Sequence, residues 1–179
     1  PCLNVILSRP YGKASSRIEK LRQSLGKYLS TRDGQELVSY LMSLGYPPEY
    51  IDLLADGFLP KGAIYGVARA KDGKIVLAAA EDAYEKIVRD SGFLGVGPED
   101  LRNSALAEEI IHILRRSFDR PGSKIREEMT TKAIARDHYL KLAKGSEGDA
   151  QQKRKYEKLA AIKEFDRLRF LKYKQLFIL

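Results

Sequence analysis

The chain has 179 residues, a single cysteine, 31% charged residues and a formal net charge of +8 at pH 7. One cysteine excludes an intramolecular disulfide framework and a cysteine-based zinc site, while the length allows one ordinary domain with its own core. The apolar stretch at residues 3–7 is too short for a signal-peptide core, and no run approaches the roughly 18 apolar residues of a membrane span. We therefore expect a soluble protein that is intracellular or assembled inside a cell.

The charge is sorted along the chain into three blocks. Residues 1–30 contain 6 Lys and Arg against 1 Glu, residues 31–110 contain 8 against 14 carboxylates, and residues 111–179 contain 18 against 9. This order suits a chain whose two cationic arms bind a polyanion and flank a body that does not bind it. We therefore predict nucleic acid as the partner of one globular unit with arms. Its regions are a basic N-terminal arm and helix (1–30), an acid-rich body (31–122) and a basic long-helix region (123–179).

Helix start and stop signals define the first elements. Ser16 and Glu19 have the spacing of a capping box, in which each side chain satisfies backbone donors left open at a helix start. Apolar residues at helical period follow it: Ile18, Leu21, Leu25, Tyr28 and Leu29. Residues 35–44 and 48–55 then predict two short helices, because Gly45 and Pro47 separate them.

The middle of the chain carries one hairpin signal. Residues 63–70 and 74–79 flank the pair Asp72-Gly73, which supplies the positive backbone angles that a two-residue connection demands. The run 78–90 then predicts a helix closed by Gly92, and residues 99–118 predict a largely buried helix.

The last third of the chain predicts two long helices. The first covers about 124–144, residues 145–148 form a flexible break, and Asp149 with Gln152 has the spacing of a new helix start. The expected fold class is therefore mainly α, a helical bundle with long N- and C-terminal helices and one short β-hairpin at about 63–79.

Apolar residues recur every three positions in the last helix, at Tyr156, Leu159, Ile162, Phe165, Leu168 and Leu171. At 3.6 residues per turn this stripe drifts by about 60° per step, so different neighbours must cover different levels of it. The chain ends on four apolar residues that we predict to form a subunit interface in a homo- or hetero-oligomer: Leu176, Phe177, Ile178 and Leu179. Docking of this tail on the chain's own core is the alternative.

Two cationic clusters are the candidate nucleic-acid contacts, because each Lys or Arg placed on a phosphate releases condensed counterions. The N-terminal cluster is Arg9, Lys13, Arg17, Lys20, Arg22 and Lys27. The C-terminal cluster, which alternates with aromatic residues, is Lys153, Arg154, Lys155, Lys158, Arg167 and Arg169. One alternative stays open for each cluster: a solvated helix face with local ion pairs for the C-terminal cluster, and attachment of the basic N-terminal helix to anionic lipid for the N-terminal cluster.

Enzymatic signals are weak. Glu109 and His112 lie one turn apart, but a di-metal bundle needs a second such pair. The glycines at 92, 95 and 97 precede the acidic helix start Glu99-Asp100, which repels phosphate. We therefore expect no catalytic residues, no metal and no cofactor. The alternative is an enzyme that acts on nucleic acid with Glu109 and His112 in its site.

The stretch Arg9-Pro10-Tyr11-Gly12-Lys13, which leads into a basic helix, resembles the DNA-wrapping major capsid proteins of filamentous and rod-shaped archaeal viruses. The resemblance implies an all-helical, dimeric subunit of the virion. Its N-terminal helices would enclose double-stranded DNA in A form inside a helical filament, with Arg9, Lys13, Arg17 and Lys20 on phosphates. Few Asn and Gln beside many charged residues are also typical of proteins from hot environments.

Together these observations predict a structural protein that packages nucleic acid, with double-stranded DNA favoured, through non-specific phosphate contacts as a viral nucleocapsid subunit. The alternative is a cellular DNA- or RNA-binding protein of regulatory or ribosome-associated type, in which a recognition helix reads base edges.

Overall fold

A computed structural model describes residues 16–46, 52–54, 59, 63–69, 75–116 and 124–176. For residues 16–17, 52–54, 68–69 and 171–176 it describes the backbone alone. The chain forms two compact units, Pro1–Phe118 and Asp119–Leu179, and each is described by itself.

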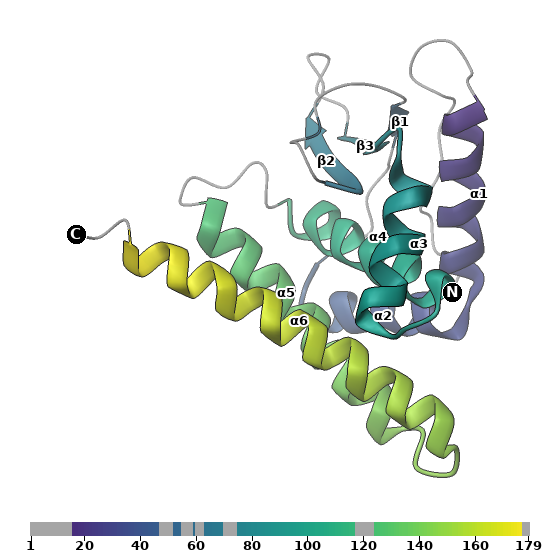
Figure 1. Cartoon of the computed structure of the whole chain (residues 1–179), viewed down its shortest axis with the longest axis vertical. Helices are drawn as coiled ribbons and strands as arrows, with labels where there is room; N and C mark the ends of the chain where they lie inside the picture. Colours follow the sequence, from purple (N-terminus) through teal and green to yellow (C-terminus); the bar gives the residue numbers. More distant parts are fainter. Residues whose placement is uncertain are drawn as a thin grey trace. The chain divides into compact units, whose positions relative to one another are not determined.

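The described residues are mainly helical, with one small sheet, so the expected fold class is confirmed (Figure 1). The elements of the first unit are α1 (Ser16–Ser30), α2 (Arg32–Ser43), β1 (Asp52–Leu54), β2 (Tyr65–Arg69), β3 (Ile75–Ala79), α3 (Ala83–Leu94) and α4 (Pro98–Arg115). The second unit contains α5 (Lys124–Lys144) and α6 (Ala150–Leu176).

Helix α1 buries one apolar face in the first unit. Ile18, Leu21, Leu25 and Tyr28 are buried, as their helical spacing predicted, and Leu29 is half-buried. The helix packs against α2, α4, β1 and β3. The basic N-terminal helix is therefore part of the core of its unit.

A tight corner joins α1 to α2. Thr31 is the N-cap of α2: its Oγ1 accepts a hydrogen bond from the Gly34 amide at 3.1 Å and donates one to the Tyr28 carbonyl at 2.6 Å. Gly34 is buried against the same turn of α1, because a Cβ built on it would meet the carbonyl oxygen of Tyr28. The corner therefore needs a residue without a side chain at position 34.

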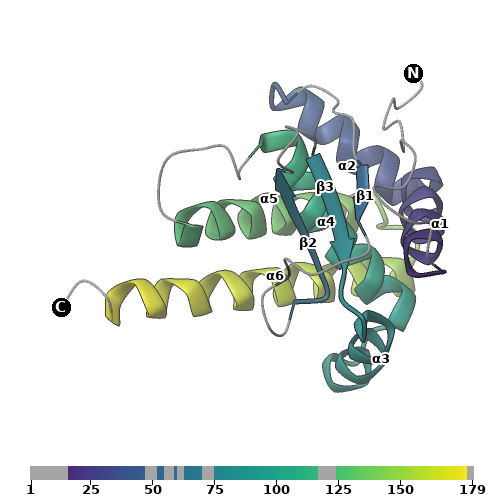
Figure 2. The same cartoon turned by 90° about the horizontal axis from the view of Figure 1, so that it is seen from above.

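The sheet has three strands in the order β1-β3-β2, which lie side by side in Figure 2. Strands β2 and β3 pair antiparallel, with Tyr65 opposite Ala79 and Arg69 opposite Ile75, so the predicted hairpin is confirmed. Its expected Asp72-Gly73 turn lies outside the described residues. All five residues of β3 are buried, as in a strand covered on both faces.

Two predicted helix positions are wrong, and both errors involve this sheet. Residues 48–55 were expected to be helical, but β1 within them pairs parallel with β3, with Asp52 opposite Val76 and Leu54 opposite Ala78. A short apolar run is compatible with either a helix or a buried strand. Pairing with β3 determines the conformation of this one. The helix expected from position 78 begins at Ala83, because β3 extends to Ala79.

Helices α3 and α4 meet at a glycine-containing bend. Gly95, with φ of 61°, ends α3 in the left-handed conformation, in place of the expected Gly92. Pro98 then opens α4, where its missing amide hydrogen costs nothing. Helix α4 is largely buried, as expected, and ends at Arg115, with Arg116 in the left-handed conformation.

In the second unit, α5 and α6 run side by side in both views and are joined by a turn at residues 145–148 (Figures 1 and 2). The expected break and helix restart are confirmed, because the Asp149 Oδ1 accepts a hydrogen bond from the Gln152 amide at 3.0 Å. We call this pair of helices the α5–α6 hairpin.

Candidate nucleic-acid interface

The inner side of α6 is set by its packing on α5. Tyr156 stacks on Tyr139 with ring centroids 6.2 Å apart, and Leu159 and Ala160 are also buried. The phenol oxygen of Tyr156 accepts a hydrogen bond from the Gln152 side chain at 2.9 Å. These contacts fix the rotation of α6 and therefore decide which of its residues lie on the other side.

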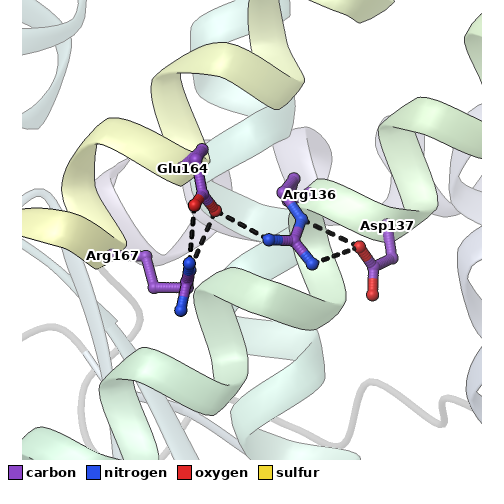
Figure 3. Close-up of polar contacts among 4 residues, drawn as sticks. All are labelled: Arg136, Asp137, Glu164 and Arg167. Atoms are coloured by element: carbon purple, nitrogen blue, oxygen red, sulfur yellow. Dashed lines mark hydrogen bonds and ion pairs between the residues drawn. The ribbon is translucent and has the colours of Figure 1, made fainter.

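The inner side becomes charged further from the turn, where Glu164 of α6 bridges two arginines (Figure 3). Arg136 Nη1 lies 2.8 Å from its Oε2, while Arg167 donates from Nε to Oε2 at 2.8 Å and from Nη2 to Oε1 at 2.6 Å. Arg136 also pairs with Asp137 at 2.7 Å. The hydrogen bonds from Arg167, followed by those from Arg136, lower the pKa of Glu164 to about 2.

This network makes the stability of the α5–α6 hairpin depend on pH in the acid range. Because the pKa of Glu164 is lowered from 4.5 to about 2, its contribution is complete above pH 4.5 and disappears as the pH falls through about 2. We expect Glu164→Gln to cost about 1 kcal/mol at neutral pH, since the pair is partly exposed, and to flatten the stability profile across that acid window. Unfolding followed by circular dichroism from pH 2 to pH 7 measures both effects.

Glu157→Gln is the matched control for this prediction, because Glu157 is exposed on the same helix and lies outside the network of Figure 3. It should keep the wild-type profile. An unchanged profile in Glu164→Gln would show that the bridge contributes nothing to folding.

The outer side of α6 carries exposed cations. Arg154, Lys158 and Arg169 are exposed, and neither Arg154 nor Arg169 forms an ion pair with another described residue. Phe165, with 63% of its surface exposed, lies on this side, because nine residues at 100° each place it about 180° from the buried Tyr156. Leu168 is exposed as well. We call Arg154, Lys158, Phe165 and Arg169 the outer face of α6.

The drift expected for the period-three apolar stripe explains this arrangement. Tyr156 and Leu159 are buried, Ile162 is half-buried, and Phe165 and Leu168 are exposed. The stripe therefore leaves the packed side of α6 after two steps. The sequence contained this signal, but the expectation that a neighbour covers every level is not met at Phe165 and Leu168.

The other predicted C-terminal contacts lie elsewhere. Arg167 is held by Glu164, and Lys155 is half-buried with its Nζ 4.7 Å from the centre of the Tyr156 ring. Lys153 is half-buried in the first turn of α6. Lys144, an exposed cation at the end of α5 that sequence reasoning did not single out, adds charge near the hairpin turn. The basic residues that end α5 are the signal that could have identified it.

The predicted N-terminal contacts are described only in part. Lys20 is exposed, Arg22 Nε lies 3.8 Å from Glu19, and Lys27 Nζ lies 2.7 Å from Glu99 of α4. The pair of Arg22 with Glu19 lies within α1, whereas the pair of Lys27 with Glu99 joins α1 to α4. Arg9 and Lys13, the Arg17 side chain, the Leu176 side chain and residues 177–179 lie outside the described part.

The other signals in the sequence concern metal binding, the pair Glu109 and His112, and membrane insertion. No group of three or more His, Cys, Asp or Glu residues there is arranged to hold a metal ion. Glu109 and His112 are both half-buried on α4. No helix among the described residues combines the length and apolar character needed to cross a bilayer.

Comparison of the chain with protein-family models, curated proteins and solved structures finds no match.

Proposed function

We propose that this chain is a structural protein that holds nucleic acid by its phosphates without reading base sequence, as the repeating subunit of a helical nucleoprotein such as a viral nucleocapsid. The observation that carries the proposal is the outer face of α6, where Arg154, Lys158 and Arg169 are exposed on a helix that packs against α5 along its other side. The basic charge of residues 111–179 supports it, with 18 Lys and Arg against 9 carboxylates.

The dimensions of α6 suit contact with a nucleic-acid backbone. Its 27 residues span about 40 Å at 1.5 Å per residue, and Arg154 and Arg169 are about 22 Å apart along the axis. A duplex about 22 Å long carries roughly 13 phosphates. Phosphates therefore lie within reach of these cations whatever the base sequence. Phosphate contacts position a protein on nucleic acid without specifying bases.

Double-stranded DNA is the proposed packaged molecule, and the virion is the proposed location. Both come from the resemblance of the segment at Arg9–Lys13 to archaeal viral coat proteins, with the N-terminal basic residues and the apolar end of the chain as the further proposed contacts to DNA and to neighbouring subunits. Lys20 is the described member of that N-terminal cluster that is exposed without an ion pair to another described residue.

Electron microscopy of the full chain with and without duplex DNA tests this function. We expect filaments whose length follows the length of the DNA, and equal affinity for unrelated duplexes at one salt concentration. Discrete small complexes at saturating protein would contradict packaging. A sharp preference for one sequence would instead support the regulatory or ribosome-associated alternative.

A further inference from the structure

We infer that Phe165 is a stacking platform for an unpaired base, so that the outer face of α6 binds single-stranded nucleic acid more tightly than the same face without the ring. The inference rests on the proposed function, because it assumes that this face contacts nucleic acid. It goes further by giving this face a second ligand, single-stranded nucleic acid, beside the duplex DNA of the proposed function.

The ring of Phe165 is available for stacking. Phe165 is 63% exposed and makes no ring contact with any described residue. The other two aromatic side chains described on α6 are occupied: Tyr156 stacks on Tyr139, and Phe170 lies 5.9 Å from the Nζ of Lys132. An exposed aromatic ring on a helix that already has a packed inner side is therefore free to accept a partner from outside.

Basic side chains lie on the same side of α6 as the ring of Phe165. Arg169 follows Phe165 by one turn, Lys158 precedes it by two turns, and all three lie within about 40° around the helix axis. A partner that covers the ring must also accept these cations. Nucleic acid has both required groups, a planar base for the ring and phosphates for the basic side chains, which is the combination that single-strand-binding surfaces use.

Only unpaired bases can reach the ring without disturbing a stack. In an intact duplex both faces of each base are already stacked, so insertion of a side chain requires neighbouring bases to separate. An unpaired base can stack on Phe165 without that cost. The basic side chains therefore bind the phosphates of a duplex and of a single strand alike. The ring stacks on the bases of a single strand alone.

Fluorescence anisotropy of the full chain with a labelled oligo(dT) and with a duplex of equal length tests the inference. Phe165→Ala should weaken single-strand binding about ten-fold, within the range observed when a stacking aromatic residue is removed, and should change duplex binding less than two-fold. Leu168→Ala is the matched control, because it removes an exposed apolar side chain without a π-face from a neighbouring position. It should change neither affinity more than two-fold.

Phe165→Trp gives a direct readout, because the chain contains no Trp of its own. The variant should retain single-strand binding, and its indole fluorescence should be quenched by oligo(dT) and unchanged by duplex. Quenching of the indole also separates a stacking role from a purely structural one.

Failure of the proposed function and failure of the stacking inference give different results. If the wild-type chain binds neither nucleic acid, the proposed function is wrong. If it binds both and Phe165→Ala has no effect, or weakens both equally, the stacking inference is overturned while the function stands. A change confined to self-association, measured by sedimentation, would assign the ring to a protein interface and would also overturn it.

Discussion

Replacement of both Arg154 and Arg169 by glutamine is expected to weaken nucleic-acid binding roughly fifty-fold at 0.1 M salt. Each phosphate contact contributes about 0.9 to the slope of log affinity against log salt concentration on duplex DNA, so the slope should fall by about two. These two arginines are exposed on α6 without ion pairs to other described residues, so their removal leaves no buried carboxylate unpaired. Binding titrations between 50 and 300 mM salt measure the slope.

Arg32→Gln together with Arg89→Gln is the charge-matched control. Both residues are exposed in the first unit and paired locally, Arg32 with Glu36 and Arg89 with Asp90. This double variant removes the same charge from the acid-rich middle of the chain and should leave the slope within experimental error of the wild type. Equal weakening by both variants would mean that net charge, and not the outer face of α6, governs binding.

Most helices follow from local sequence signals. The bounds of α5 match the expected 124–144, and the cap at Asp149 restarts α6 where its side chain predicted, because capping and glycine breaks act within a few residues. Strand β1 could not be predicted in the same way. Its three residues acquire their conformation from pairing with β3, a partner more than 20 positions away that the local pattern does not reveal.

The sequence predicts that the C-terminal helix is basic. It does not predict which of its basic residues are exposed on one face. Composition singles out the basic C-terminal helix, yet it does not distinguish Arg167, held by Glu164, from Arg169, which is exposed two residues later. That distinction depends on the rotation of α6 against α5, which is set by contacts such as Tyr139 with Tyr156. The same rotation places Phe165 outside, although its spacing groups it with buried residues.

A second strong effect is expected from Gly34→Ala at the corner between α1 and α2. The added Cβ would meet the Tyr28 carbonyl oxygen and come within 3.0 Å of the Leu29 Cα, and these are backbone atoms that cannot rotate away. We expect a loss of about 3 kcal/mol in the free energy of unfolding and a melting temperature roughly 10 °C lower. Thermal and urea unfolding followed by circular dichroism measure this loss.

Gly26→Ala makes the same substitution one turn before the end of α1. It distinguishes a steric clash at Gly34 from a general intolerance of the two helices to an added side chain. A Cβ at Gly26 meets nothing within 4 Å, so alanine should stabilise α1 by up to about 1 kcal/mol through its higher helix propensity. The two variants should therefore shift stability in opposite directions. If Gly34→Ala were neutral, α2 would have to start at a different angle from α1, and the hydrogen bonds of Thr31 to Tyr28 and Gly34 would not form the corner described above.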